Sequence, residues 1–221
     1  MPAEPGGTRG RLSRDKVLRA ALHIADAHGV AGLTIRSLAA ALGVKPMSVY
    51  HHVANKDEIL DGIVDLVFGE IDLPATGGDW RVEILQRAQS TRQVLRRHSW
   101  ATVLLESRRT PGPANLRHHD SVLGTFRAAG FSVEMTAHAY ALVDAYVYGF
   151  ALQEASLPFS DPDSVPEFAG PILEQFSTGE YPHLVELATE FVMQPGYDFG
   201  DEFDFGLELV LDGLAQRLDS A

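Results

Sequence analysis

Every long segment of this 221-residue sequence predicts an α-helix, so the sequence predicts an all-α fold. Apolar residues recur three and four positions apart, which places them on one face of a helix. No segment of useful length alternates apolar and polar residues as a half-buried strand would. Glycine, proline and helix-capping residues separate the apolar segments, so we expect short connections between the helices.

The first 60 residues predict a compact group of short helices that follows a flexible basic tail at residues 1–12. Each helix begins at a side chain that can accept a hydrogen bond from a free N–H group, or at a proline whose missing N–H costs nothing there. These starting residues are Ser13, Thr34, Pro46 and Asn55. We expect Gly29 and Gly43 to end the first two helices.

The second and third helices fit a helix-turn-helix motif. Two closely crossing helices need a small residue at the crossing, a glycine in the turn and a branched apolar residue on the second helix. Ala39, Gly43 and Val49 supply these features. With Val49 and Val53 facing inward, the rest of "KPMSVYHH" projects outward. Exposed donors and apolar tips on a short helix suit contacts with DNA bases and phosphates.

The remainder of the sequence predicts a larger helical domain. Expected helices cover residues 80–98, 100–108, 115–129, 133–155, 167–176, 182–192 and 203–218. We therefore divide the chain into a tail at 1–12, a helix-turn-helix domain at 13–60, and a ligand-binding and dimerisation domain at 61–221.

Two helices, at 133–155 and 203–218, carry more apolar surface than one neighbour can cover. Pairing them across a two-fold axis would give a four-helix bundle, so we expect a homodimer. The residues assigned to this interface are Val143, Val147, Gly149, Leu207, Leu211 and Leu214. Packing of the same residues within one chain is the alternative.

Charge is distributed unevenly along the chain. Residues 1–60 hold eight Lys or Arg residues against five Asp or Glu residues, which gives this segment a net charge of +3. The remaining 161 residues therefore carry a net charge of −15, and the whole chain carries −12. A basic segment on an acidic body favours contact with nucleic acid through the basic segment alone. The absence of cysteine excludes disulfides and thiolate metal sites. The sequence lacks a secretory signal and any apolar run of about 18 residues, so we expect a cytoplasmic protein outside the membrane.

The segment "LTIRSLAAALGVKPMSVYHHVANKDEILDGIV" resembles the DNA-binding region of the tetracycline-repressor (TetR) family, including the Tyr-x-His-Val-x-Asn-Lys run at Tyr50–Lys56. The resemblance continues in "DWRVEILQRAQSTRQVLRRH", "AAGFS", "YGFALQE" and "FDFGLELVLDGL". It implies a homodimeric regulator without enzymatic activity or cofactor, a repressor rather than an activator. Such a protein binds a palindromic double-stranded DNA operator and is released by a small-molecule inducer.

The resemblance also implies a set of DNA-contacting residues. They are Thr34, Arg36, Lys45, Pro46, Met47, Ser48, Tyr50, His51, His52 and Lys56. Tyr50, His52 and Lys56 match phosphate-contacting positions of the family. Thr34 and Arg36 match positions that touch phosphate and an outer base. The sequence departs from the tetracycline repressor at Lys45, Pro46, Met47 and His51, which predicts a different operator.

By the same resemblance, the inducer binds within residues 80–190 and re-aims the fourth helix. The expected lining is Arg87, Thr91, Trp100, Leu104, Arg108, His119, Val122, Phe126, Tyr140, Asp144 and Gln153. The tetracycline repressor holds its drug as a magnesium chelate through a histidine and a glutamate. Leu104 and Gln153 occupy those positions, so we expect a partly aromatic or polycyclic ligand other than tetracycline–magnesium. Arg87 and Arg108 could bind a carboxylate or form salt bridges.

Two histidine pairs raise alternatives. His51 and His52 are adjacent and so about 100° apart around a helix, which does not suit one shared metal ion. The "HHD" at 118–120, with His98 and Asp144, could belong to a helical metal-dependent phosphohydrolase of HD type. The simpler interpretation is a histidine that faces a pocket and an aspartate that faces water. A scaffold protein, the third alternative, would leave the basic helix-turn-helix unexplained.

Overall fold

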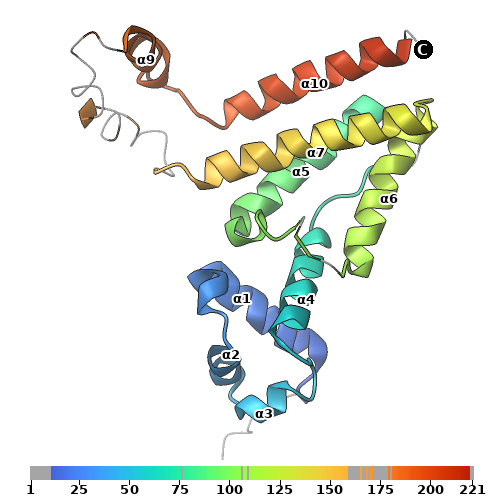
Figure 1. Cartoon of the computed structure of the whole chain (residues 1–221), viewed down its shortest axis with the longest axis vertical. Coiled ribbons are helices and arrows are strands. Elements are labelled where there is room, and N and C mark those ends of the chain that lie inside the picture. Colours follow the sequence, from blue (N-terminus) through green and yellow to red (C-terminus); the bar gives the residue numbers. More distant parts are fainter. Residues whose placement is uncertain are drawn as a thin grey trace, which may run out of the picture. The chain divides into compact units, whose positions relative to one another are not determined.

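The chain is described here from a computed structural model. The structure describes residues 11–75, 77–105, 107–108, 110–158, 165, 168, 170–171, 179 and 181–219. These residues form helices, turns and loops without a strand, which confirms the all-α prediction (Figure 1). Nearly all of the expected tail at 1–12 and most of the expected helix at 167–176 lie outside them. Among the described helices, none combines the length and apolar character needed to cross a membrane.

The chain forms two compact units. The head unit comprises Met1–Leu73 and Gln93–Ser121, and the body unit comprises Pro74–Arg92 and Val122–Ala221. Helices α5 (Trp80–Arg97) and α6 (Pro113–Ala128) each contribute residues to both units. The head unit therefore includes residues well beyond the predicted domain boundary at residue 60, and that boundary stays a prediction.

Four helices form the N-terminal part of the head unit: α1 (Arg14–Gly32), α2 (Ile35–Leu42), α3 (Pro46–Val49) and α4 (Lys56–Phe68). The predicted N-terminal caps are confirmed, and of the two glycines only Gly43 ends its helix. Ser13, Thr34 and Asn55 each accept a hydrogen bond from a backbone N–H of the following turn. Gly43 ends α2 in the left-handed conformation, with a φ of 66°. Gly29 has the same φ but lies inside α1, so it bends the helix instead of ending it.

The body unit contains α7 (Val133–Ala155), α9 (Pro182–Leu187), η3 (Ala188–Val192) and α10 (Asp201–Asp219). The long helices α7 and α10 lie side by side (Figure 1). Tyr146 of α7 donates its hydroxyl to the carbonyl oxygens of Glu202 and Phe203, at 3.0 and 2.9 Å. Gly206 leaves room for this ring, because a Cβ there would collide with it.

One expected helix is wrong. Residues 100–108 were expected to be helical, whereas the structure has only the 3₁₀ helix η1 (Ser99–Ala101), followed by turns through Leu105. Two apolar residues of this segment, Ala101 and Leu105, are nevertheless buried. A turn in which Leu105 N–H bonds to the Ala101 carbonyl buries them as a helix would. The spacing of apolar residues along the sequence therefore could not distinguish this turn from a helix.

Candidate DNA-binding and effector sites

Helix α3 is short and is held by two buried valines. Val49 and Val53 are 0% and 2% exposed. The turn before α3 is fixed by backbone bonds from Gly43 and Val44 to the carbonyl oxygens of Ala40 and Ala39. Ala39 is itself buried, as the crossing of two helices requires. The predicted helix-turn-helix is therefore present in the head unit.

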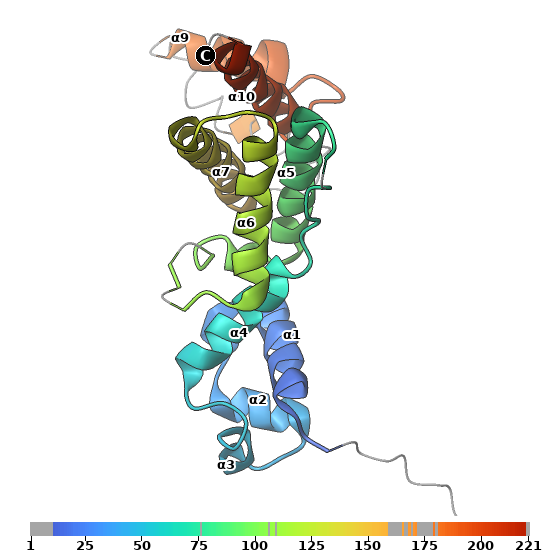
Figure 2. The same cartoon turned by 90° about the vertical axis from the view of Figure 1, so that its right-hand side faces the viewer.

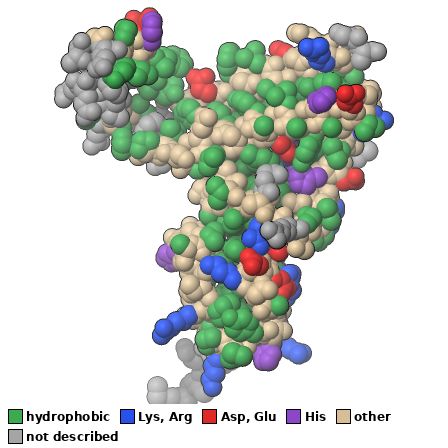
Figure 3. Space-filling view, viewed as in Figure 1, with side chains coloured by type: hydrophobic (Ala, Val, Ile, Leu, Met, Phe, Trp, Pro, Cys, Tyr) green, Lys and Arg blue, Asp and Glu red, His purple; other side chains and the backbone are tan. Residues whose placement is uncertain are grey.

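The side chains assigned to DNA surround this short helix. Met47 is 70% exposed and Tyr50 is 46% exposed. Ser48 and His52 are half-buried, and the others of the set are exposed: Thr34, Arg36, Lys45, Pro46, His51 and Lys56. Within the described residues, no carboxylate pairs with Arg36 or Lys45. Figure 3 shows Lys, Arg and His side chains at the end of the head unit that α3 forms.

Thr34 caps α2 as predicted, and Ser37 completes a reciprocal cap that was not predicted. Its side chain accepts from Ser37 N–H at 3.0 Å, while its own N–H donates to the Ser37 hydroxyl at 2.9 Å. This reciprocal capping box fixes the beginning of α2. Serine three positions after threonine was the available signal.

The residues expected to line an effector pocket divide between the two units. Seven belong to the body unit: Arg87, Thr91, Val122, Phe126, Tyr140, Asp144 and Gln153. Arg87 and Asp144 form a buried ion pair, with Nη1 and Oδ1 2.7 Å apart. Burial acts to lower the pKa of Arg87, but Asp144, Tyr148 and Tyr140 together raise it above its ordinary value. Val122 and Phe126 are fully buried, whereas Gln153 is exposed.

The other four expected pocket residues, Trp100, Leu104, Arg108 and His119, belong to the head unit. Trp100 donates its indole N–H to Asp26 at 2.7 Å. His119 contacts the ring of Phe68 edge-on, with centroids 5.5 Å apart. Arg108 pairs with Asp61, as the salt-bridge alternative anticipated. Leu104 is half-buried.

The carboxylate of Glu154, next to Gln153, also forms a salt bridge. Arg92 donates to its two oxygens at 2.6 and 3.1 Å, in the bidentate arrangement that strengthens such pairs. The Arg92 guanidinium lies over the rings of Phe150 and Phe203, 5.2 and 5.0 Å from their centroids. Glu154 therefore joins α7 to α5 within the body unit.

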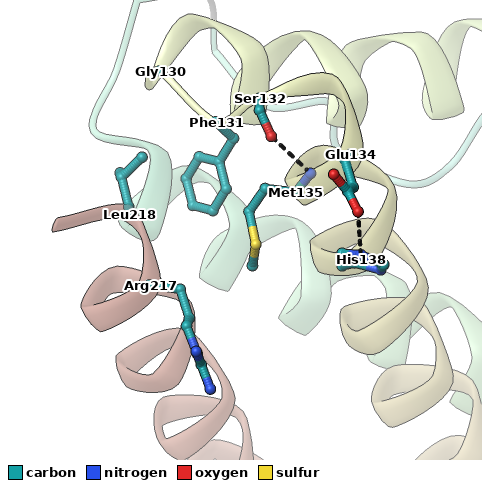
Figure 4. Close-up of a pocket in the computed structure, with 8 residues that line it drawn as sticks. All are labelled: Gly130, Phe131, Ser132, Glu134, Met135, His138, Arg217 and Leu218. Atoms are coloured by element: carbon teal, nitrogen blue, oxygen red, sulfur yellow. Dashed lines mark hydrogen bonds and ion pairs between the residues drawn. The ribbon is translucent and has the colours of Figure 1, made fainter. Parts of the chain in front are cut away.

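A surface groove in the body unit involves none of the expected pocket residues. Its volume is about 530 Å³, and it lies between the beginning of α7 and the end of α10. Figure 4 shows Phe131, Met135 and Leu218 facing one another across it. On one side, His138 Nε2 lies 3.8 Å from a carboxylate oxygen of Glu134. Gly130, which turns the chain into α7 with a φ of 98°, also lines the groove.

The residues recruited for the phosphohydrolase alternative make other contacts. His98 lies between Asp26 and Glu70, at 2.7 and 3.2 Å. His118 is buried and packs on Phe68, with centroids 5.4 Å apart. Asp144 is paired with Arg87. Across the described part of the chain, no group of three His, Asp or Glu side chains is placed to hold a metal ion.

Five of the six residues assigned to a dimer interface lie inside the body unit's own core. Val143, Val147, Leu207 and Leu211 are 0% exposed, and Leu214 is 3% exposed. Their own chain covers them, as the alternative of packing within one chain expected. Gly149 differs, because a Cβ there would meet nothing within 4 Å.

Two family models together match most of the chain. The model described as "Bacterial regulatory proteins, tetR family" matches residues 17–63, and "Tetracyclin repressor-like, C-terminal domain" matches residues 73–218. The chain is 36% identical over 219 residues to the HTH-type transcriptional repressor DrrR1 of Streptomyces coeruleorubidus. That similarity covers 94% of this chain and 79% of the relative.

Solved structures have the same fold. ActR of Streptomyces coelicolor in complex with actinorhodin is 28% identical, with a TM-score of 0.78 over 93% of this chain and 96% of that one. BioQ with its natural double-stranded DNA operator is 26% identical, with a TM-score of 0.65 over 93% of this chain and 99% of that one.

Proposed function

Because this chain belongs to the TetR family of bacterial regulatory proteins, we infer that it is a ligand-responsive transcriptional repressor rather than an enzyme. The observation that carries this inference is the exposed polar surface of α3, held on buried Val49 and Val53. BioQ, a solved relative, was determined on its DNA operator. We place the protein in the cytoplasm, where bacterial operators are accessible.

We propose that α3 enters the major groove of a near-palindromic operator. Tyr50, His52 and Lys56 contact phosphates, which position the protein without reading sequence. Met47 and Ser48 face base edges, and exposed Met47 suits contact with a thymine methyl group. In a two-fold symmetric dimer the half-sites lie one helical turn apart, about 34–36 Å.

Lys56→Ala and Met47→Ala are expected to affect DNA binding differently. Loss of a phosphate contact weakens binding to all sequences and reduces the slope of log K against log salt by about 1. Loss of a base contact changes the preferred base at one position of each half-site. The operator is first recovered by selection from genomic DNA, and affinities are then measured between 50 and 200 mM salt, the range over which such contacts are resolved.

Arg19→Ala is the control, because Arg19 is an exposed basic residue that pairs with Asp15 on α1 and is absent from the proposed contact set. Its salt slope should match that of the wild type. A Lys56→Ala protein with an unchanged salt slope would contradict the phosphate assignment. Failure of the wild type to select any palindrome-like site would contradict the proposed function itself.

We propose that the dimer forms through α7 and α10, but through their exposed faces. Leu142, Ala145, Gly149 and Leu152 repeat along α7 at helical spacing and are exposed or half-exposed. Phe205, Leu209 and Gly213 do the same along α10, with Phe205 65% and Leu209 58% exposed. A Cβ at either glycine would meet nothing within 4 Å, so another helix could approach closely there. The buried residues of the same two helices pack in the core of their own chain, on the opposite side from this exposed face.

We propose that the effector binds within residues 80–190, with the body residues of the expected pocket among its contacts. The buried pair Arg87–Asp144 and Thr91 supply polar groups, and Val122 and Phe126 supply apolar ones. Such a combination suits a partly aromatic ligand of medium size. ActR, a solved relative, was determined in complex with actinorhodin, which supports a small-molecule effector for this chain.

A thermal-shift screen of metabolites and antibiotics is expected to find a compound that stabilises the protein without magnesium. Ligand at 100 times its Kd adds about 2.7 kcal/mol to the stability of the folded state. Tetracycline with magnesium should give no shift, because Leu104 and Gln153 offer no metal-binding imidazole or carboxylate. Release of operator DNA by the same compound is the second measurement. Magnesium-dependent stabilisation by tetracycline would contradict this prediction.

A further inference from the structure

His98 lies where three elements of the head unit meet. Helices α1 and α4 pack against each other (Figure 2), and η1 packs against α1. Asp26 belongs to α1, Glu70 follows the end of α4, and His98 immediately precedes η1. The His98 side chain is only 8% exposed, and its ring lies between the carboxylates of the other two residues. We call these three residues the histidine junction.

The contacts of the histidine junction require a charged imidazole. His98 Nδ1 lies 2.7 Å from Asp26 Oδ1, and Nε2 lies 3.2 Å from Glu70 Oε2. An ionised carboxylate can only accept a hydrogen bond, so each ring nitrogen must donate one. A neutral imidazole has a single N–H group, whereas the imidazolium cation has two. Only the charged form of His98 therefore satisfies both contacts.

Each carboxylate of the junction has a second donor. The indole N–H of Trp100 donates to Asp26 at 2.7 Å, and Arg97 at the end of α5 donates to Glu70 at 3.0 Å. Burial acts to raise the pKa of Glu70, but Arg97 and His98 together lower it. Glu70 therefore stays ionised in the range in which imidazole groups titrate, about pH 5 to 8. The charged groups that face His98 are the two carboxylates, and Arg97 acts on it through Glu70.

From this geometry we propose that the histidine junction is a pH-sensitive switch in the head unit. The charged ring of His98 joins α1 to the residues that follow α4. Loss of one proton leaves a single N–H group, so the ring can donate to only one of the two carboxylates. The other carboxylate then faces an acceptor nitrogen and is repelled by it. The charged form therefore stabilises the head unit at low pH, and this stability is lost as the pH rises through the titration of the imidazole.

Operator binding is expected to follow the same pH dependence. Helix α1 packs against α2, and α2 packs against α3, so a looser junction leaves the helix-turn-helix less restrained. Docking a mobile unit on DNA costs more conformational entropy than docking a fixed one, so operator affinity falls. This consequence rests on the proposed function, whereas the effect on the stability of the head unit does not.

Urea unfolding of the wild type and of Glu70→Gln tests the switch without DNA. Trp100 fluorescence reports on the junction, and a Trp80→Phe background removes the signal of the body unit. In Glu70→Gln, the amide can donate to Nε2, so a neutral His98 keeps both of its contacts. The unfolding equilibrium constant of the wild type should therefore rise between about pH 6 and pH 8 by about fivefold more than that of Glu70→Gln. A hydrogen bond to a charged group typically contributes about tenfold, and the partial exposure of Glu70 reduces its effect.

His98→Gln is the second variant, because it removes the titrating ring. It should be less stable than the wild type at about pH 6 and show the same weaker pH dependence as Glu70→Gln. His23→Gln is the matched control, because His23 is an exposed histidine on α1, the helix that carries Asp26. It should keep the pH dependence of the wild type. Glu70→Gln covers the case in which His98→Gln does not fold.

Nitrogen-15 NMR of the histidine rings measures the protonation itself, with His98 assigned by the signals that His98→Gln lacks. Both ring nitrogens of His98 should carry protons at about pH 6 and only one at about pH 8. An unchanged protonation state over this range, or equal pH dependence of stability in the wild type and Glu70→Gln, would overturn the proposal.

The same pair of proteins separates this proposal from the proposed function. On the selected operator, the affinity of the wild type should fall more between about pH 6 and pH 8 than that of Glu70→Gln. His51 and His52 are present in both proteins, so their titration at the DNA cancels in the comparison. Equal losses of affinity would overturn the link between the junction and DNA binding. A pH-dependent head unit in a protein that selects no operator would count against the proposed function alone.

Discussion

Replacing Asp144 by alanine is expected to lower the free energy of unfolding of the body unit by about 3–5 kcal/mol. The Arg87 side chain is fully buried, and the Asp144 side chain is 10% exposed. Removing the carboxylate leaves the guanidinium in a poorly solvated place without its counter-charge. The same reasoning predicts that Arg87→Met with Asp144→Leu is far less harmful than Asp144→Ala, because it removes both charges and keeps the volume apolar.

Urea unfolding followed by tryptophan fluorescence measures this effect. Trp80 packs on Phe126 and Phe131 in the body unit, with ring centroids 6.0 and 5.1 Å apart. The other tryptophan, Trp100, belongs to the head unit, so a Trp100→Phe background isolates the signal of the body unit. Protein concentration is held constant, since dimerisation also contributes to stability.

Asp15→Ala is the matched control for Asp144→Ala. Asp15 pairs with Arg19 at 3.0 Å, but both side chains are at least 60% exposed. An exposed pair contributes about 0–1 kcal/mol, because water screens it. A double variant of the buried pair that is as unstable as Asp144→Ala would contradict the charge argument and indicate lost packing instead.

The sequence was most informative about features that depend on neighbouring residues. The capping side chains of Ser13, Thr34 and Asn55 act on N–H groups within three residues, so they predicted where three helices begin. The phase of Val49 and Val53 likewise predicted which side chains of α3 are exposed. Both inferences need only the geometry of one helix turn.

Features that depend on distant residues could not be predicted in this way. Arg108 binds a carboxylate 47 residues away, and Glu154 binds an arginine 62 residues away. Each charged residue had several partners of opposite sign, and local spacing does not choose among them. The inward face of α7 was ambiguous for a similar reason. Leu142 and Val143 are both apolar and adjacent, yet one is 47% exposed and the other is fully buried.

The largest effect on function is expected from changes on the exposed faces of α7 and α10, which the proposed dimer buries. Leu209→Glu combined with Leu142→Glu is expected to yield monomers that keep their helical content but no longer bind the operator. Both leucines are about half exposed, so the charges cost little in the isolated chain. In a dimer they would be buried without partners, at several kcal/mol each. A monomer can bind only one half-site, so the affinity for a palindrome should fall by orders of magnitude.

Sedimentation of the purified double variant measures its oligomeric state, and circular dichroism verifies its fold. Val133→Glu with Val82→Glu is the matched control. Both valines are exposed, at 73% and 46%, but neither belongs to the proposed dimer faces of α7 and α10. This control should remain dimeric and bind the operator. Charges at the buried Val147 or Leu211 would be uninformative, because they would disrupt the chain's own core. A Leu142→Glu/Leu209→Glu protein that stays dimeric would show that α7 and α10 pair through another surface.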